Sequence, residues 1–127
     1  MLKIMIVGAG GFFGAIFRFT ISGLVNNNFS HTSFPLGTLV VNIMGCFAIG
    51  ILFSLLGTKF TVSAETQLLL IVGFIGSFTT FASFGHETLN LIQADKFNLS
   101  LINIAAQMLL GFGSIIAGRW TTEFLIK

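Results

Sequence analysis

Residues 73–84 have the sequence GFIGSFTTFASF and lie in the middle of a long apolar segment that extends from Glu65 to Gln93. As a single α-helix this segment would be about 43 Å long at about 1.5 Å per residue, whereas the hydrocarbon core of a bilayer is about 30 Å thick. Its central glycines and β-branched threonines weaken a helix. Broken helices are tolerated at membrane depth where their freed carbonyl groups line a site or bind an ion. The segment therefore predicts a membrane helix that is interrupted near its middle.

The composition of the whole chain also indicates a membrane protein. Of its 127 residues, 8% are charged and 54% are apolar, and the mean hydropathy is +0.98. Soluble domains carry about 25% charged residues, so this chain lacks the polar surface of a soluble globule. The net charge of +2 comes from scattered side chains, whereas nucleic-acid binding requires clustered Lys and Arg. We therefore expect a lipid environment and no nucleic-acid partner.

Further apolar runs predict a bundle of four membrane helices that forms one domain over residues 1–127. The candidate helices cover residues 2–25, 36–56, 65–93 and 99–120. Pro35 is suited to the start of the second helix, and Ser63 and Asn98 are suited to N-cap the third and fourth. Residues 57–61 are expected to form a turn. Membrane β-strands would alternate polar and apolar residues in units of about ten, so these longer, uniformly apolar runs favour an all-α fold.

The N-terminal segment has two other interpretations. Lys3 and the apolar residues after it fit the plan of a signal peptide, but the apolar run continues past any cleavage site to Arg18 and beyond. Residues 4–14 resemble a dinucleotide-binding loop, but the acidic residue and the βαβ unit that this loop requires are missing. Close helix packing at Gly10 and Gly14 is the better explanation. We expect the same packing role at Gly45, Gly50, Gly111, Gly113 and Ala117.

The charged residues specify the orientation in the membrane only weakly. One side, with the N-terminus, the second loop and the C-terminus, holds Lys3, Lys59, Arg119 and Lys127. The other side holds Lys96 and is nearer to Arg18. Because the excess of Lys and Arg sets orientation, so small an excess permits insertion in both directions. An antiparallel homodimer is therefore a hypothesis.

Few strongly polar side chains lie within the spans, and each of them must face protein or water. They are Arg18, Asn42, Ser77, Thr79, Thr80, Ser83, Glu87, Asn90, Asn103, Gln107 and Ser114. Asn103, Gln107 and Ser114 share one helical face. One interpretation is that these groups only hold the helices together by hydrogen bonds. The other is a pathway, and since nearly all of the groups are neutral donors, it would favour an anion over a proton or a cation.

Phe78, Phe81 and Phe84 recur at every third position of the third span. Such a stripe commonly faces lipid or packs in a core. Beside a helix break another use is available, because the positive edges of phenyl rings could line a path for a small anion without binding it tightly. No nucleophile–base pair or metal cluster is evident, and His31 and His86 are isolated, so we do not expect an enzyme.

Three motifs make this chain similar to the small bacterial fluoride channels of the CrcB/Fluc type. Residues 11–18, GFFGAIFR, resemble the glycine-rich first helix of that family, and residues 35–45, PLGTLVVNIMG, resemble its second-helix signature. Residues 73–84 resemble its broken third helix. The resemblance covers nearly the whole chain. It implies a cell-membrane protein that assembles as an antiparallel, dual-topology homodimer, with two fluoride pores and a structural Na⁺ at the dimer centre.

The resemblance also implies roles for single residues. The implied pore residues are Asn42, Phe81, Phe84, Thr80, Ser83 and Arg18. Of these, the asparagine is the pore amide, the phenylalanines present ring edges, the hydroxyl residues line the pore, and the arginine makes the vestibule positive. The backbone carbonyls of Gly76 and Thr79 would hold the Na⁺, and Glu87 matches an acidic family position to which we assign no role.

The chain departs from the family pattern at three positions. Ala82 stands where a hydroxyl residue is usual, and Ser77 stands where a second glycine is usual. In the fourth helix, Gly111 aligns with the usual pore-lining serine. Donors on this helix would then come from Asn103, Gln107 or Ser114.

The resemblance implies a passive channel that exports cytoplasmic fluoride and confers fluoride resistance. Fluoride is small and strongly hydrated, so a pore must replace its water with closely spaced donors and still release it. Two alternatives remain open at this stage. A small four-helix multidrug or cation exchanger would need an acidic residue in the membrane, and Glu87 is the acid nearest to a span. A non-transporting membrane-packing subunit would use its polar residues only to hold helices together.

Overall fold

The computed structural model describes residues 1–57 and 62–126, and the secondary structure of these residues is helical throughout. In chain order the helices are α1 (Leu2–Asn28), α2 (Leu36–Leu56), α3 (Ala64–Gln67), η1 (Leu68–Ile75), α4 (Gly76–Phe78), α5 (Phe81–Gln93) and α6 (Phe97–Leu125). Four stretches of the described chain are long and apolar enough to span a membrane: α1, α2, the run Ala64–Gln93, and α6. The prediction of an all-α protein with four membrane helices is confirmed.

The bounds of the first three spans lie close to the predicted ones. The second begins and ends as predicted, and the first continues to Asn28. Ser63 is the N-cap of α3, since its side chain accepts a hydrogen bond from the Thr66 N–H at 3.2 Å. Of the predicted turn, residues 58–61 lie outside the described residues, as does Lys127.

The predicted N-cap of the fourth span at Asn98 is wrong, because α6 already begins at Phe97. The reason is the turn that ends α5. There Asp95 has a φ of 58°, and the Lys96 N–H donates to the Leu91 carbonyl at 2.8 Å. This turn provides a hydrogen-bond donor for a backbone carbonyl group at the end of α5. The next helix then begins at once, without a side chain that caps its N-terminus.

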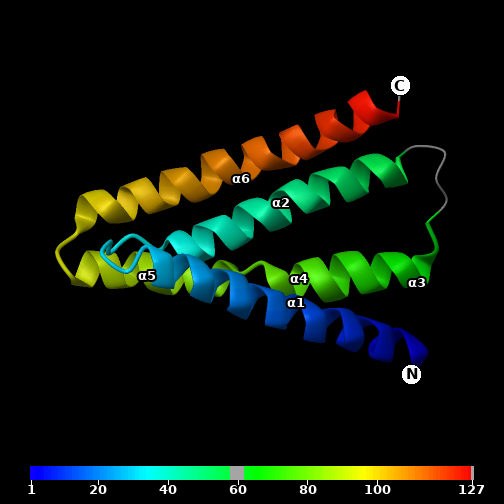
Figure 1. Ribbon diagram of the computed structural model, residues 1–127, viewed down its shortest axis with the longest axis horizontal. Helices are drawn as coiled ribbons and strands as arrows, with labels where there is room; N and C mark the ends of the chain where they lie inside the picture. The colour runs from blue at the N-terminus through cyan, green and yellow to red at the C-terminus, as the bar shows by residue number, and fades with distance from the viewer. Residues whose placement is uncertain (58–61, 127) are drawn as a thin grey trace.

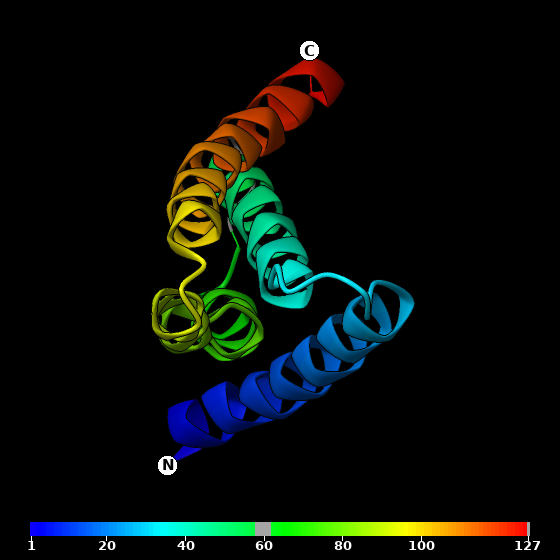
Figure 2. The same cartoon turned by 90° about the vertical axis from the view of Figure 1, so that its left-hand side faces the viewer.

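The spans run roughly along one axis and form an open bundle. In Figure 1 both termini lie at the same end of the molecule, and the connections 29–35 and 94–96 lie at the opposite end. α2 packs along α6, and α1 packs along η1 and α4. Seen end-on in Figure 2, α1 and α6 lie at opposite edges, with α2 and the run from α3 to α5 between them. The predicted placement of the two termini on one side is confirmed.

Glycines allow the close contact between α1 and the third span. Gly10 and Gly14 are buried. A Cβ atom at Gly10 would overlap the Leu69 carbonyl, and one at Gly14 would overlap the carbonyl of Phe74. The predicted small-residue face of α1 is confirmed, and it brings two backbones together at a distance that no side chain would permit.

The other predicted packing positions divide into two groups. Gly45 and Gly50 lie against Thr79 and Ile115, and Gly111 is in ordinary contact with Cys46. The prediction is wrong for Gly113 and Ala117, which are exposed. Gly118 takes their place, since a Cβ atom there would overlap the backbone of Phe47. The error arises because small residues follow one another on two different faces of α6.

We expect Gly10→Ala to destabilise the folded protein by about 1–3 kcal/mol, because the added methyl group forces the backbones of α1 and η1 apart. Gly8→Ala is the matched control, since no described atom lies within 4 Å of a Cβ at that position. Each detergent-solubilised variant is heated and then run on a size-exclusion column, and the measurement is the temperature at which the peak of folded protein disappears. Equal temperatures for the two variants would show that the contact is not tight.

The interior of the chain is unusually polar. Among the described residues, the largest fully buried side chains are Val41, Asn103 and Ser100, whereas Phe19 and Phe124 are more than four-fifths exposed. In hydrocarbon an apolar side chain gains little from burial, and polar groups must find partners inside the protein. Close backbone contacts and hydrogen bonds therefore hold this fold together, and the exposed apolar side chains face lipid or a partner.

Candidate functional site

The site begins where two extended residues separate α4 from α5. Thr79 has φ −84° and ψ 158°, and Thr80 has φ −150° and ψ 121°. The Thr80 N–H donates to Asn42 Oδ1 at 2.9 Å instead of to the Gly76 carbonyl four residues earlier. The Ser83 N–H donates to Thr80 Oγ1 at 3.2 Å instead of to the Thr79 carbonyl. The carbonyls of Gly76 and Thr79 thus lose the donors that a continuous helix would give them.

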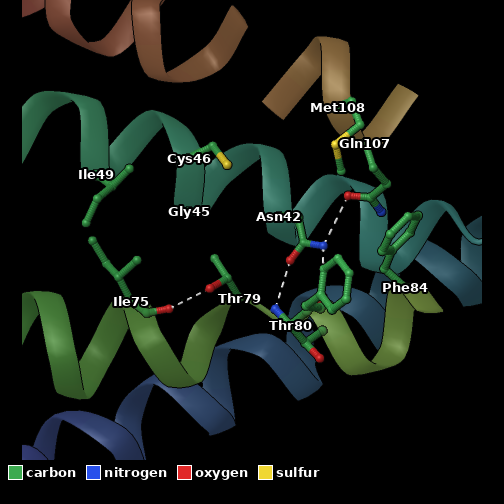
Figure 3. A pocket seen from close by; sticks show the side chains of 11 residues that line it. Asn42, Gly45, Cys46, Ile49, Ile75, Thr79, Thr80, Phe84, Gln107 and Met108 are labelled. Carbon is green, nitrogen blue, oxygen red and sulfur yellow. Dashed lines mark hydrogen bonds between the residues drawn. The ribbon is translucent and has the colours of Figure 1, made fainter. Parts of the chain in front are cut away.

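Asn42 connects these extended residues to two other helices (Figure 3). Its Nδ2 donates to the Thr80 carbonyl at 3.1 Å and to Gln107 Oε1 at 3.1 Å, while its Oδ1 accepts from the Thr80 N–H. Asn42 belongs to α2 and Gln107 to α6, so one amide joins three segments. Both hydrogens of the Asn42 amide are engaged with protein acceptors.

A cavity of about 340 Å³ opens beside this amide. It is lined by Asn42, Gly45, Cys46, Ile49, Ile75, Thr79, Thr80, Phe81, Phe84, Gln107 and Met108. The Phe81 and Phe84 rings lie 5.4 Å apart at an interplanar angle of 61°, an edge-to-face arrangement. Phe84 is buried, whereas Phe81 is 77% exposed. The fold thus brings together four of the implied pore residues, one amide, one hydroxyl and two rings.

The remaining implied pore residues lie around a second cavity of about 260 Å³. Its polar lining consists of Arg18, Ser22, Asn26, Thr38, Thr80, Ser83 and Glu87. Thr80 lines both cavities, and its hydroxyl donates to Ser83 Oγ at 3.2 Å. Arg18 and Ser83 therefore do not line the first cavity. They line the second cavity, which shares Thr80 with the first.

Glu87 extends the series of polar groups toward the end of the molecule that carries the 29–35 and 94–96 connections. Its Oε1 accepts a hydrogen bond from Thr38 Oγ1 at 2.7 Å. It also lines a third cavity of about 270 Å³ together with Ser33 and Lys96. The sequence interpretation missed Thr38. The signal was available, because Thr38 lies one helical turn before Asn42 and so shares its face.

The three candidate donors of α6 occupy different surroundings. Gln107 lines the first cavity, whereas Asn103 and Ser114 do not. Asn103 is fully buried and donates to Thr88 Oγ1 at 2.9 Å. Of the residues that depart from the family pattern, Ser77 donates to the Gly11 carbonyl at 2.9 Å and so joins α4 to α1. Ala82 is exposed on α5.

Comparison with known proteins identifies the family. The family model described as CrcB-like protein, Camphor Resistance (CrcB), matches residues 5–119. The fluoride-specific ion channel FluC 1 of Methanosarcina acetivorans is 40% identical over 119 residues, which cover 94% of this chain and 89% of that protein. The fluoride-specific ion channel FluC of Desulforapulum autotrophicum is 40% identical over 116 residues, which cover 91% of this chain and 92% of that protein.

These matches extend over all four membrane spans. With the four long apolar helices, they make this chain a multi-pass protein of the cell membrane. Each alignment covers about nine-tenths or more of both this chain and the relative. The chain belongs to the CrcB family.

Proposed function

We propose that this chain is a passive, fluoride-selective ion channel that exports cytoplasmic fluoride and so confers fluoride resistance. The observation that carries the proposal is the cavity in which Phe81 and Phe84 lie edge to face beside Gln107. Relatives that align over more than nine-tenths of this chain are named fluoride-specific ion channels.

The lining suits a small anion that must be held weakly. The Gln107 amide is a neutral polar group in this lining that can replace water around fluoride, and the positive edges of the phenyl rings add a shallow attraction. Thr80 lines both the first and the second cavity. In the second cavity the positive charge of Arg18 attracts anions, and the Glu87 carboxyl group opposes that attraction when it is ionised. Hydrogen fluoride enters cells as a neutral acid and dissociates at neutral pH, so a passive pathway for the trapped anion lowers internal fluoride.

The proposed channel is an antiparallel, dual-topology homodimer. Phe81 is largely exposed in the single chain, and so is Gly76, so a second copy would cover groups that otherwise face lipid. The start of α1, which carries Lys3, and the last part of α6, which carries Arg119, lie at the end with the termini, whereas the 94–96 connection, which carries Lys96, lies at the opposite end. This distribution specifies orientation only weakly.

The residues present fit a structural Na⁺ at the centre of this dimer. The carbonyls of Gly76 and Thr79 have lost their helical donors to Asn42 and Thr80, and unwound backbone carbonyls are typical Na⁺ ligands in membrane proteins. When bound, the ion would neutralise carbonyl dipoles brought together from the two subunits. The role of these two residues is to hold the subunits together and not to conduct.

We expect Gly76→Val to abolish dimer formation with little effect on the folding of the single chain. Inside the chain a Cβ at Gly76 would meet only the Ile71 carbonyl, at 3.6 Å among the described atoms. Gly113→Val is the control, because it adds the same side chain at an exposed position of α6. The measurement is the molar mass of each detergent-solubilised variant, first in Na⁺ and then with a large organic cation in place of Na⁺. A Gly76→Val dimer that still requires Na⁺ would contradict the assignment of this carbonyl.

Liposome efflux tests the function itself. Purified protein in vesicles loaded with potassium fluoride should release fluoride when valinomycin carries the potassium, and chloride should leave far more slowly. An imposed proton gradient should not drive the flux. Well-folded dimers that release no fluoride would refute the channel.

One observation favours the exchanger as a second candidate. Glu87 Oε2 is buried and has no hydrogen-bond partner among the described residues, as the acid of a proton-coupled exchanger would require. The same vesicles decide between the two. An exchanger would move an organic cation against a proton gradient and would leave fluoride inside.

A further inference from the structure

A fourth cavity, of about 570 Å³, lies between α2 and α6 toward the end of the molecule that carries both termini. The two helices are in backbone contact just before it, where a Cβ at Gly50 or Gly118 would overlap a carbonyl oxygen of the other helix. The apolar side chains that line the cavity are Ile49, Phe53 and Ile115, and the polar ones are Ser54, Arg119 and Glu123. Cavities of about 300–1,000 Å³ commonly bind small molecules.

The cavity extends across the boundary between the hydrocarbon and the headgroups of the bilayer. α2 has 21 residues and is therefore about 31 Å long, which matches the hydrocarbon thickness of about 30 Å. Gly57 follows α2 and also lines the cavity, so the cavity reaches the level at which the hydrocarbon ends. Trp120 lies at this level and is 69% exposed, as is typical of tryptophan at a membrane interface. Arg119 and Glu123 therefore lie among the headgroups.

The two charged side chains of the cavity are available to a ligand. Arg119 and Glu123 are four residues apart on α6, so they share one face of the helix. Within residues 1–57 and 62–126, however, no ion pair joins them to each other or to another side chain. Both are exposed and both line the cavity. A ligand with one negative and one positive group would match them.

We propose that this cavity binds one zwitterionic phospholipid whose headgroup carries a phosphate and a primary ammonium group. The Arg119 guanidinium donates to the phosphate, an arrangement in which arginine can form two parallel hydrogen bonds. The ammonium group donates to the Glu123 carboxylate, and an acyl chain lies along Ile49 and Phe53. This site is separate from the proposed anion pathway, because none of its polar side chains lines the first or the second cavity.

The charge pair also discriminates between headgroups. A choline headgroup carries a quaternary ammonium group, which has no hydrogen to donate to Glu123. A glycerol headgroup has no positive charge, so its phosphate would meet Arg119 but would leave the carboxylate without a partner. The ethanolamine headgroup satisfies both side chains, and we expect the cavity to prefer it.

Two substitutions separate the two halves of the headgroup. Glu123→Gln removes the partner of the ammonium group, and Arg119→Gln removes the partner of the phosphate. Glu65→Gln and Lys3→Gln are the matched controls. They remove the same charges from α3 and from the start of α1, which lie at the same end of the molecule in Figure 1, and neither residue lines the cavity.

The experiment titrates detergent-purified protein with ethanolamine, choline and glycerol phospholipids that have identical acyl chains. Native mass spectrometry gives the apparent Kd of each lipid. We expect the wild-type protein to bind the ethanolamine lipid about tenfold more tightly than the other two, the effect of one hydrogen bond between charged groups. Glu123→Gln should lose this preference, and Arg119→Gln should weaken the binding of all three lipids by about tenfold. The control variants should bind as the wild type does.

Several results would overturn the site. Equal affinity of the wild type for the three lipids is one, and an unchanged preference in Glu123→Gln is another, which decides the matter even if Arg119→Gln does not fold. Soluble phosphoethanolamine is added as a competitor. If it binds as tightly as the lipid, the acyl chain contributes nothing and the ligand is not a lipid. If Arg119→Gln binds lipid normally but no longer forms dimers, a second copy of the chain occupies the cavity instead.

Discussion

Asn42→Asp is expected to lower fluoride flux by about 100-fold or more. The new carboxylate still accepts from the Thr80 N–H, but its second oxygen faces the Thr80 carbonyl and Gln107 Oε1, both of which are acceptors. Three acceptor oxygens, the new carboxylate oxygen, the Thr80 carbonyl oxygen and Gln107 Oε1, then lie close together without a hydrogen between them. The negative charge also lies beside the cavity that we propose as the anion pathway. An acidic side chain at membrane depth costs roughly 2.5–3.5 kcal/mol, which corresponds to about two orders of magnitude in rate.

The measurement is initial fluoride efflux per dimer, together with the thermal stability of each variant. Asn90→Asp is the control for the added charge, because Asn90 is exposed on α5, where its partner is His86. We expect that variant to conduct within a factor of about three of wild type, since surface charges act weakly. Normal flux through Asn42→Asp would show that the amide does not orient the site.

Phe81→Ile is expected to reduce fluoride flux by about tenfold or more. Isoleucine keeps an apolar surface of similar extent but has no positive ring edge to offer an anion. A tenfold fall corresponds to about 1.4 kcal/mol in the barrier. Phe81 is a better test than Phe84, because Phe81 is exposed in the chain and Phe84 is buried, so that truncation at Phe84 would also disturb packing.

Phe124→Ile serves as the control for this substitution, since Phe124 is 82% exposed near the end of α6 and lines none of the cavities described above. Flux is compared between the two variants in the same lipid and at the same protein density. Equal fluoride flux through the two variants would show that the Phe81 ring takes no part in conduction. If Phe81→Ile loses fluoride flux but keeps the molar mass of a dimer, the substitution affects conduction and not assembly.

The spans could be predicted from the sequence because a bilayer imposes length and composition on every helix. Pro35 and Ser63 then indicated where two of them begin, and those starts are confirmed within one residue. The start of α6 could not be predicted in this way. It depends on the positive φ of Asp95 and on a bond from Lys96 back to Leu91, and no residue type requires that turn.

The residue types of the site were predictable, but their partners were not. Asn42 bonds Thr80 and Gln107, which lie 38 and 65 positions further along the chain. Spacing within one helix shows which side chains share a face, but it does not show which face of another helix lies opposite. For the same reason, the sequence offered Asn103, Gln107 and Ser114 as equal candidates. The packing of α6 on α2 separates them.

The polar interior also determines how this fold responds to temperature. When helices separate within a bilayer, their apolar side chains pass from protein to hydrocarbon and not to water. The large heat-capacity change of unfolding in soluble proteins comes from apolar groups that become hydrated. With Asn103 and Ser100 at the centre and phenylalanines on the outside, this chain hydrates little apolar surface when its helices come apart. Its stability in the membrane will therefore decrease almost linearly on heating, without the maximum and the cold denaturation that curve the stability of water-soluble domains.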